Sequence, residues 1–189
     1  MKSFIIKFRI MIQFAMLLTY VAYCETMPPK PFPGVMKTES EFRATENLFK
    51  EKVAWVQENP HSSNVMMQLK DLYTWVGAAP YVKAAHNTRY IPGFMENKKQ
   101  YAKFDVLFWE YTYAQIACSF DAKANDSRLR CIEAGLKSMI ACYRNICMKD
   151  GNPKWEFMEN YISNLTATGI PNFLKGVDDS IKNAKSNAP

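Results

Sequence analysis

The chain has 189 residues, of which 48% are hydrophobic and 22% charged, and it contains 7 glycines and 10 prolines. This composition excludes a disordered, collagen-like or low-complexity chain and is typical of one globular domain, or at most two. The formal net charge of +6 arises from 24 basic and 18 acidic residues, which are interspersed along the chain. Because the basic residues are not clustered, we expect no nucleic-acid partner.

The first 24 residues have the pattern of a secretory signal peptide. Three basic residues precede an uncharged run over residues 10–22, and Ala22-Tyr23-Cys24 supplies small side chains at the cleavage positions. The run is shorter than the roughly 20 apolar residues that span a membrane. We therefore expect cleavage after Cys24, secretion to the extracellular space and no membrane association afterwards; an uncleaved anchor is the alternative. Cleavage removes three basic residues and no acidic one, so the formal charge of the remaining 165 residues is +3.

The remaining chain divides into a lead, one helical domain and a short tail. Four prolines within residues 28–33 predict an extended lead over residues 25–37, which we interpret as a spacer, with a docking motif as the alternative. Residues 38–184 are predicted to form a single domain, and residues 185–189 a polar tail.

Apolar residues recur at helical spacing through this domain, which predicts an all-α bundle of five to six helices. Thr38 and Glu41 form a capping box at the first helix, and Asn59-Pro60 ends it. Residues 78–93 are expected to form an irregular connection. The helices expected, in chain order, are residues 38–59, 62–77, 95–120, 127–149 and 153–168, followed by a weaker helix towards residue 184.

Four cysteines remain after cleavage, and an even number in an oxidising compartment predicts two disulfides. If residues 127–149 form one helix, Cys131 and Cys142 lie about 16 Å apart along its axis, whereas bridged Cα atoms lie within about 7 Å. Cys131 and Cys147 are farther apart still. The expected pairs are therefore Cys118 with Cys131 and Cys142 with Cys147, and the second pair requires the last helical turn to unwind.

The helix expected over residues 95–120 carries large apolar side chains in nearly every direction, so it should be central and buried. Its aromatic residues have two interpretations: they fill the core, or they line a pocket for a small apolar ligand. The candidate pocket residues are Tyr101, Phe104, Phe108, Trp109 and Tyr111.

No catalytic motif occurs in the sequence. There is no Gly-rich phosphate loop, no His-Glu-x-x-His motif and no nucleophile elbow. The two histidines, His61 and His86, are 25 positions apart and have no metal ligand at suitable spacing. We therefore expect no enzymatic activity, no metal and no cofactor; an enzyme would need polar groups that converge around His86.

Two acceptor sequences for N-linked glycans occur, at Asn125 and Asn164, and we expect Asn125 to be the better site. The combined pattern indicates a secreted, non-enzymatic binding protein. Its partner is expected to be an extracellular protein, which makes the chain an interaction module or secreted effector. The alternative is a carrier of a small hydrophobic ligand. A filled core with an exposed Trp or Met patch would favour the interaction module, and an enclosed aromatic pocket the carrier.

Overall fold

The computed structural model describes residues 26–83, 87–121, 127–149 and 154–186. Throughout these ranges the regular elements are helices, which confirms the all-α prediction, and none of them is long and apolar enough to cross a membrane. Residues 1–24, which the sequence predicts to be a signal peptide, lie outside the described residues. The elements are α2 (Glu39–Arg43), α3 (Glu46–Glu58), α4 (Val65–Ala78), η1 (Thr88–Tyr90), η2 (Lys98–Gln100), α5 (Phe104–Ser119), α6 (Ser127–Met148), α7 (Glu156–Thr168) and α8 (Ile170–Ser186).

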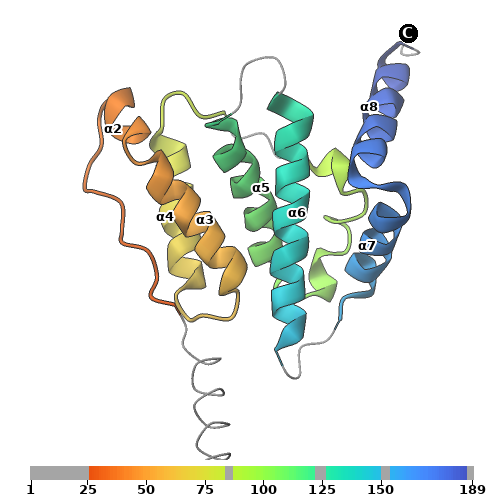
Figure 1. Ribbon diagram of the computed structural model, residues 1–189, viewed down its shortest axis with the longest axis horizontal. Helices are drawn as coiled ribbons and strands as arrows, with labels where there is room; N and C mark the ends of the chain where they lie inside the picture. Colours follow the sequence, from red (N-terminus) through yellow and green to blue (C-terminus); the bar gives the residue numbers. More distant parts are fainter. Residues whose placement is uncertain (1–25, 84–86, 122–126, 150–153, 187–189) are drawn as a thin grey trace, which may run out of the picture.

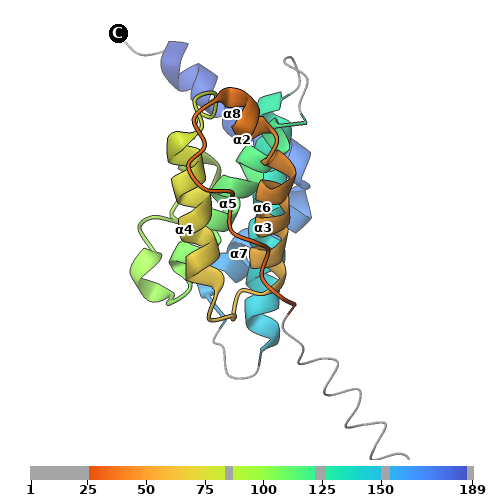
Figure 2. The ribbon, with the colours of Figure 1, turned by 90° about the vertical axis from the view of Figure 1, so that its left-hand side faces the viewer.

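Helix α5 is the centre of the molecule, as its sequence predicts. It packs against α3, α4 and α6, and α3 packs in turn on α4 and α6 (Figures 1 and 2). Ten of its residues are buried, including Leu107, Tyr111 and Tyr113. Helices α7 and α8 follow one another along α6, α7 beside its lower part and α8 beside its upper part, and the end of α8 extends beyond the bundle (Figure 1).

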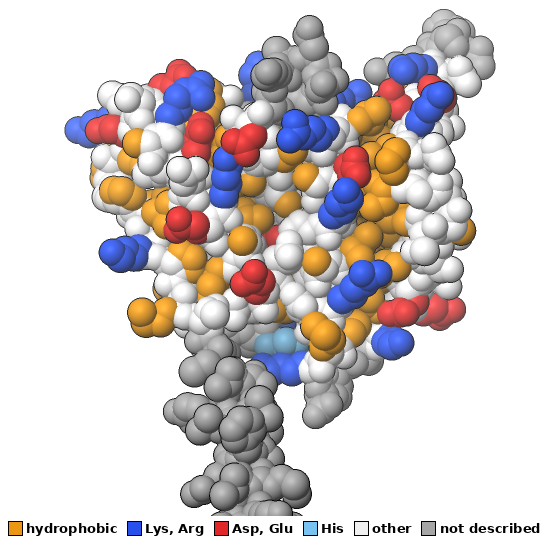
Figure 3. Space-filling view, in the orientation of Figure 1, with side chains coloured by type: hydrophobic (Ala, Val, Ile, Leu, Met, Phe, Trp, Pro, Cys, Tyr) orange, Lys and Arg blue, Asp and Glu red, His pale blue; other side chains and the backbone are white. Residues whose placement is uncertain are grey.

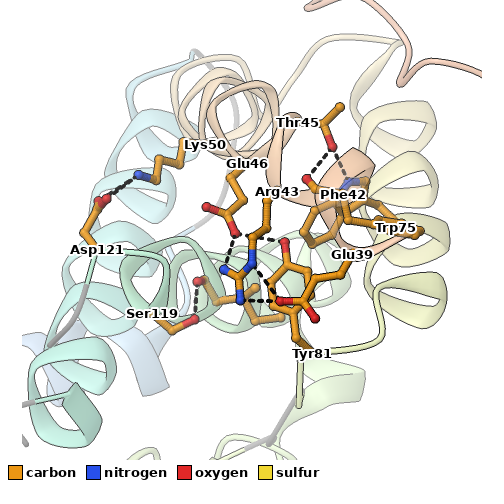
Figure 4. A network of polar contacts seen from close by, with 11 residues as sticks. Glu39, Phe42, Arg43, Thr45, Glu46, Lys50, Trp75, Tyr81, Ser119 and Asp121 are labelled. Atoms are coloured by element: carbon orange, nitrogen blue, oxygen red, sulfur yellow. Dashed lines mark hydrogen bonds and ion pairs between the residues drawn. The ribbon is translucent and has the colours of Figure 1, made fainter. Parts of the chain in front are cut away.

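The first predicted helix is divided into two. The capping box is confirmed, because Thr38 N donates to Glu41 Oε2 at 2.8 Å while Glu41 N donates to Thr38 Oγ1 at 3.4 Å. The helix breaks at Thr45, whose hydroxyl donates to the Phe42 carbonyl and accepts from the Trp75 indole, at 2.8 and 2.9 Å (Figure 4). A side chain that bonds to nearby backbone competes with the helix, and here Trp75 holds it in place.

The helix predicted over residues 95–120 begins at Phe104, nine residues late. The preceding segment forms turns and η2 because its aromatic rings converge on Trp155. The ring of Tyr101 stacks on Trp155 at 5.0 Å, and that of Phe94 lies 5.4 Å from it.

Helix α6 is continuous from Ser127 to Met148, as predicted, and this continuity contradicts one of the two disulfides. Cys142 and Cys147 are five positions apart on an unbroken helix, so their side chains diverge and both are free thiols. Cys118 and Cys131 are also unbonded, although their side chains are neighbours. The predicted bundle is therefore correct, and its two predicted disulfides are absent from the structure.

The last two helices meet at Gly169, whose φ of 78° ends α7. The left-handed backbone conformation favours glycine, because a side chain there would be strained. Pro171 then lies in the first turn of α8, where a proline is tolerated. The weak final helix of the prediction is thus real and reaches Ser186.

The described residues of the connection after α4, 79–83 and 87–93, are irregular as predicted, apart from η1. The connection is anchored through Tyr90, which is buried. The Tyr90 carbonyl accepts from the Tyr161 hydroxyl at 2.6 Å, and the Tyr90 hydroxyl donates to Asp178 at 3.1 Å. The Tyr111 hydroxyl donates to the Asn87 carbonyl at 2.9 Å. These bonds tie the connection to α5, α7 and α8.

Candidate binding groove

Four of the five aromatic residues of the predicted pocket, all except Tyr111, pack against other rings in the described part of the chain. Tyr101, Phe104 and Tyr111 are buried, whereas Phe108 and Trp109 are partly exposed. Phe104 stacks on Phe108 at 6.0 Å, and Trp109 stacks on Tyr113 at 5.3 Å. The three hollows considered below are lined by other residues.

The remaining candidate residues are dispersed. His61 is half-buried, and its Nε2 lies 3.1 Å from the Ile146 carbonyl, while burial lowers its pKa. His86 and Asn125 fall outside the described residues. Asn164 is exposed on α7, and Leu165 beside it is buried on the opposite side. Within the described part of the chain, no group of three His, Cys, Asp or Glu side chains is arranged to hold a metal ion.

A groove of about 360 Å³ runs between α6, α7 and the start of α8. Its wall on α6 spans seven positions, about 10 Å along the axis. In Figure 3, hydrophobic side chains form a band along this seam, right of centre, with basic side chains on it. The residues that line the groove are Lys137, Ile140, Ala141 and Arg144 of α6, Ile162, Leu165 and Thr166 of α7, and Gly169 and Ile170 at the junction of α7 and α8.

Helical spacing explains why these residues share one groove. The four α6 residues follow the i, i+3, i+4, i+7 pattern of a single helix face, and the three α7 residues follow i, i+3, i+4. Ile140 and Leu165 are buried and form the floor, whereas Ala141, Ile162 and Ile170 remain partly exposed. The groove is therefore open and apolar along its length.

The rim of the groove is positively charged. Lys137 and Arg144 are exposed, and no acidic residue lines the groove. Lys137 pairs with Glu133 one turn away, at 2.7 Å, whereas Arg144 makes no ion pair with any described residue. An apolar floor beneath unpaired positive charge suits an amphipathic ligand that carries acidic groups.

A second hollow, between α2, the end of α5 and α6, is lined by three basic residues; Arg43 and Arg128 are ion-paired, whereas Lys83 makes no ion pair with any described residue. Arg43 lies 2.7 Å from Glu39 and 3.4 Å from Glu46, with its guanidinium over the ring of Tyr81 (Figure 4). Arg128 lies 3.8 Å from Asp178. Each of the two sites thus has one basic residue without an ion pair among the described residues, but polar atoms contribute more to the lining of this hollow, so it suits an apolar ligand less than the groove beside Arg144. The third hollow lies between α8 and η1 and is lined by residues such as Phe173, Val177 and Ile181.

Helix α4 presents apolar side chains to solvent. Met66, Met67 and Tyr73 are 58%, 51% and 62% exposed. The Tyr73 ring lies 5.8 Å from Trp109, edge to face, so this surface continues onto α5. The face of α4 that carries Met66, Met67 and Tyr73 is thus an exposed Met patch, the feature expected of an interaction module.

The core contains a polar cluster that the pattern of apolar residues in the sequence does not predict. Glu110 is fully buried on α5, and the Ser138 hydroxyl lies 2.5 Å from Glu110 Oε1 and 2.6 Å from Gln57 Oε1. One hydroxyl proton serves only one of these two acceptors. A protonated Glu110 resolves the conflict, because it donates to Ser138, which donates to Gln57. Burial raises the pKa of Glu110 to about 8, which agrees with the neutral form.

In comparisons with known proteins, no family model, curated protein or solved structure matches this chain. Its function must therefore be argued from its own surfaces.

Proposed function

We propose that the protein is a secreted, non-enzymatic interaction module that binds an acidic amphipathic helix of an extracellular protein in the groove between α6, α7 and α8. One observation carries the proposal: an open apolar groove with Lys137 and Arg144 on its rim and no acidic residue in its lining. A helix laid in such a groove inserts apolar side chains at i, i+3 or i+4, and i+7. An acidic residue at its flank then faces Arg144, which makes no ion pair with any described residue, while Lys137 is already paired with Glu133.

Two further features support this function. The aromatic residues of α5 stack on one another, so the hydrophobic core itself needs no ligand to fill it. The signal-like first 24 residues are consistent with a partner outside the cell.

The proposal is tested by placing a photo-crosslinking amino acid at Thr166, which is exposed on the groove, and incubating the protein with its native extracellular fluid. We expect the crosslinked partner segment to be acidic and to have helical apolar spacing. A synthetic peptide of that segment is then titrated against the wild type and two variants, Ala141→Glu and Arg144→Glu. Both variants should bind at least tenfold more weakly, because they place negative charge beside an acidic ligand.

Ala54→Glu is the matched control, because Ala54 is exposed on α3, away from the groove. It makes the same chemical change and should leave peptide binding unaltered. A crosslinked segment that is basic, no crosslink at Thr166, or equal binding by all three variants would refute the proposal.

A carrier of a small hydrophobic ligand is the second candidate function. Its ligand would bind in the same groove and not among the aromatic residues of α5. The aliphatic lining and the basic rim also suit a small anionic amphiphile. A fluorescent fatty acid that binds the wild type but not the Ala141→Glu variant would identify the groove as a lipid site instead.

One thiol pair is proposed to bridge in the secreted protein. The side chain of Cys118 contacts that of Cys131, and burial, followed by this contact, raises the pKa of Cys131 to about 12. Oxidised glutathione accepts two electrons and two protons from the two thiols, which leaves one disulfide and two molecules of reduced glutathione. We expect one Cys118–Cys131 bond by non-reducing peptide mapping, with Cys142 and Cys147 still alkylated. A Cys131→Ser variant should form no intramolecular bond; a bridge in that variant would contradict the assignment.

A further inference from the structure

The proline-rich lead lies along α3 and α4 in the structure (Figure 2). The Trp55 indole donates to the Thr26 carbonyl at 2.9 Å, and the Asn59 amide donates to the Thr26 hydroxyl at 3.0 Å. The Gln68 amide donates to the Pro29 carbonyl at 3.4 Å. Side chains of both helices therefore hold the lead through its backbone.

An aromatic side chain anchors the middle of the lead. The ring of Phe32 lies 5.9 Å from the ring of Trp75 and 5.1 Å from the Lys52 ammonium. Lys52 itself is 0% exposed and donates to Gln68 at 2.6 Å and to Asp71 at 3.2 Å. The surface of α3 and α4 that the lead covers, the α3–α4 groove, thus offers a position for an aromatic ring beside Lys52, whose charge is already paired with Asp71.

These contacts match the chemistry by which proteins recognise proline-rich segments. Proline has no N–H group, so an extended proline-rich chain presents carbonyl acceptors and little else from its backbone. Indole and amide donors in an aromatic-lined groove satisfy those carbonyls, and a pocket for one ring supplies specificity. Trp55, Gln68 and Trp75 provide these parts.

We infer that the α3–α4 groove is a recognition site for proline-rich extended segments of other proteins, and that residues 26–33 occupy it in cis. The lead is joined to α2 through Gly34, which has no other atom within 4 Å of an added side chain, and Val35, which is 87% exposed. The lead therefore leaves the groove without breaking a packed connection. While it is tethered, its high effective concentration disfavours a segment from another chain.

The experiment uses the full secreted chain with a protease site inserted between Gly34 and Val35. A fluorescent peptide of residues 26–34 is titrated before and after the cut, and circular dichroism reports whether the bundle stays folded. We expect saturable binding to the cut protein and at least tenfold weaker binding to the uncut protein. An unlabelled proline-rich peptide with a Phe at the same position should compete, whereas the Phe32→Ala peptide should not.

Trp55→Phe removes the indole donor and keeps a ring, so it should weaken peptide binding about threefold to tenfold. Ala141→Glu, in the separate α6–α8 groove, should leave peptide binding unchanged, so this inference is tested independently of the proposed function. Unfolding of the cut protein, absence of exchange, or binding insensitive to both Phe32→Ala and Trp55→Phe would overturn the inference and make the lead a fixed part of the fold.

Discussion

Between pH 5 and pH 8 the wild-type protein should lose stability steadily, and a Glu110→Gln variant should lose much less. Burial raises the pKa of Glu110 from 4.5 to about 8 in the folded state. Between these values the folded protein keeps a proton that the unfolded chain has released. Each pH unit in this window therefore lowers the folding equilibrium constant by up to about tenfold. The loss begins above the unfolded pKa and is complete above the folded pKa.

Glutamine is the matched replacement because it resembles the protonated acid. Its amide nitrogen donates to Ser138 as the neutral carboxyl does, and it carries no charge at any of these pH values. Cys142 is the titratable group that interacts electrostatically with Glu110. Burial raises the pKa of Cys142 well above its ordinary value, so its thiol stays neutral between pH 5 and pH 8. Urea unfolding at unit pH steps measures the slope, and the exposed Glu51→Gln variant on α3 is the control. Parallel pH profiles for all three proteins would show that Glu110 is ionised in the fold.

A Gly135→Ala substitution should destabilise the protein by about 1–3 kcal/mol, although alanine is the better helix former. A Cβ atom at this position would lie 2.6 Å from the Tyr111 carbonyl oxygen and 2.7 Å from Gln115 Cγ. The Tyr111 carbonyl belongs to the backbone of α5 and cannot rotate away. The two most closely packed helices would have to separate.

Gly176→Ala on α8 is the matched control, because an added Cβ meets no atom within 4 Å. It should raise the free energy of unfolding by about 0.5–1 kcal/mol through helix propensity alone. Chemical denaturation of the two variants should thus give opposite signs. A stabilised Gly135→Ala variant would mean that α5 and α6 do not approach each other closely at this position.

The sequence predicted those elements whose signals are local. Helix α6 has an uninterrupted stripe of apolar residues, and its predicted bounds match the structure within one residue. The capping box at Thr38 needs only residues within one turn. By contrast, the break at Thr45 depends on Trp75, which is thirty residues away, and no local pattern contains that bond.

The candidate surfaces were harder to predict for the same reason. The groove depends on the angle at which α7 and the start of α8 meet α6, and periodicity shows only which face of each helix is apolar. The prolines predicted an extended lead, but no local pattern around Trp55 or Gln68 indicated that these side chains would contact it. Glu110 had one signal: an acidic residue within a helix that is apolar on every side.

Helix α5 is enclosed by other helices, so its backbone amides are protected from solvent in the folded protein. Its inner turns are shielded by α3, α4 and α6, so water and base reach their amide groups only when the whole bundle comes apart. Amide hydrogens of α5 should therefore exchange with solvent at the rate of global unfolding. Those in the projecting end of α8 should exchange through local fraying, many orders of magnitude faster.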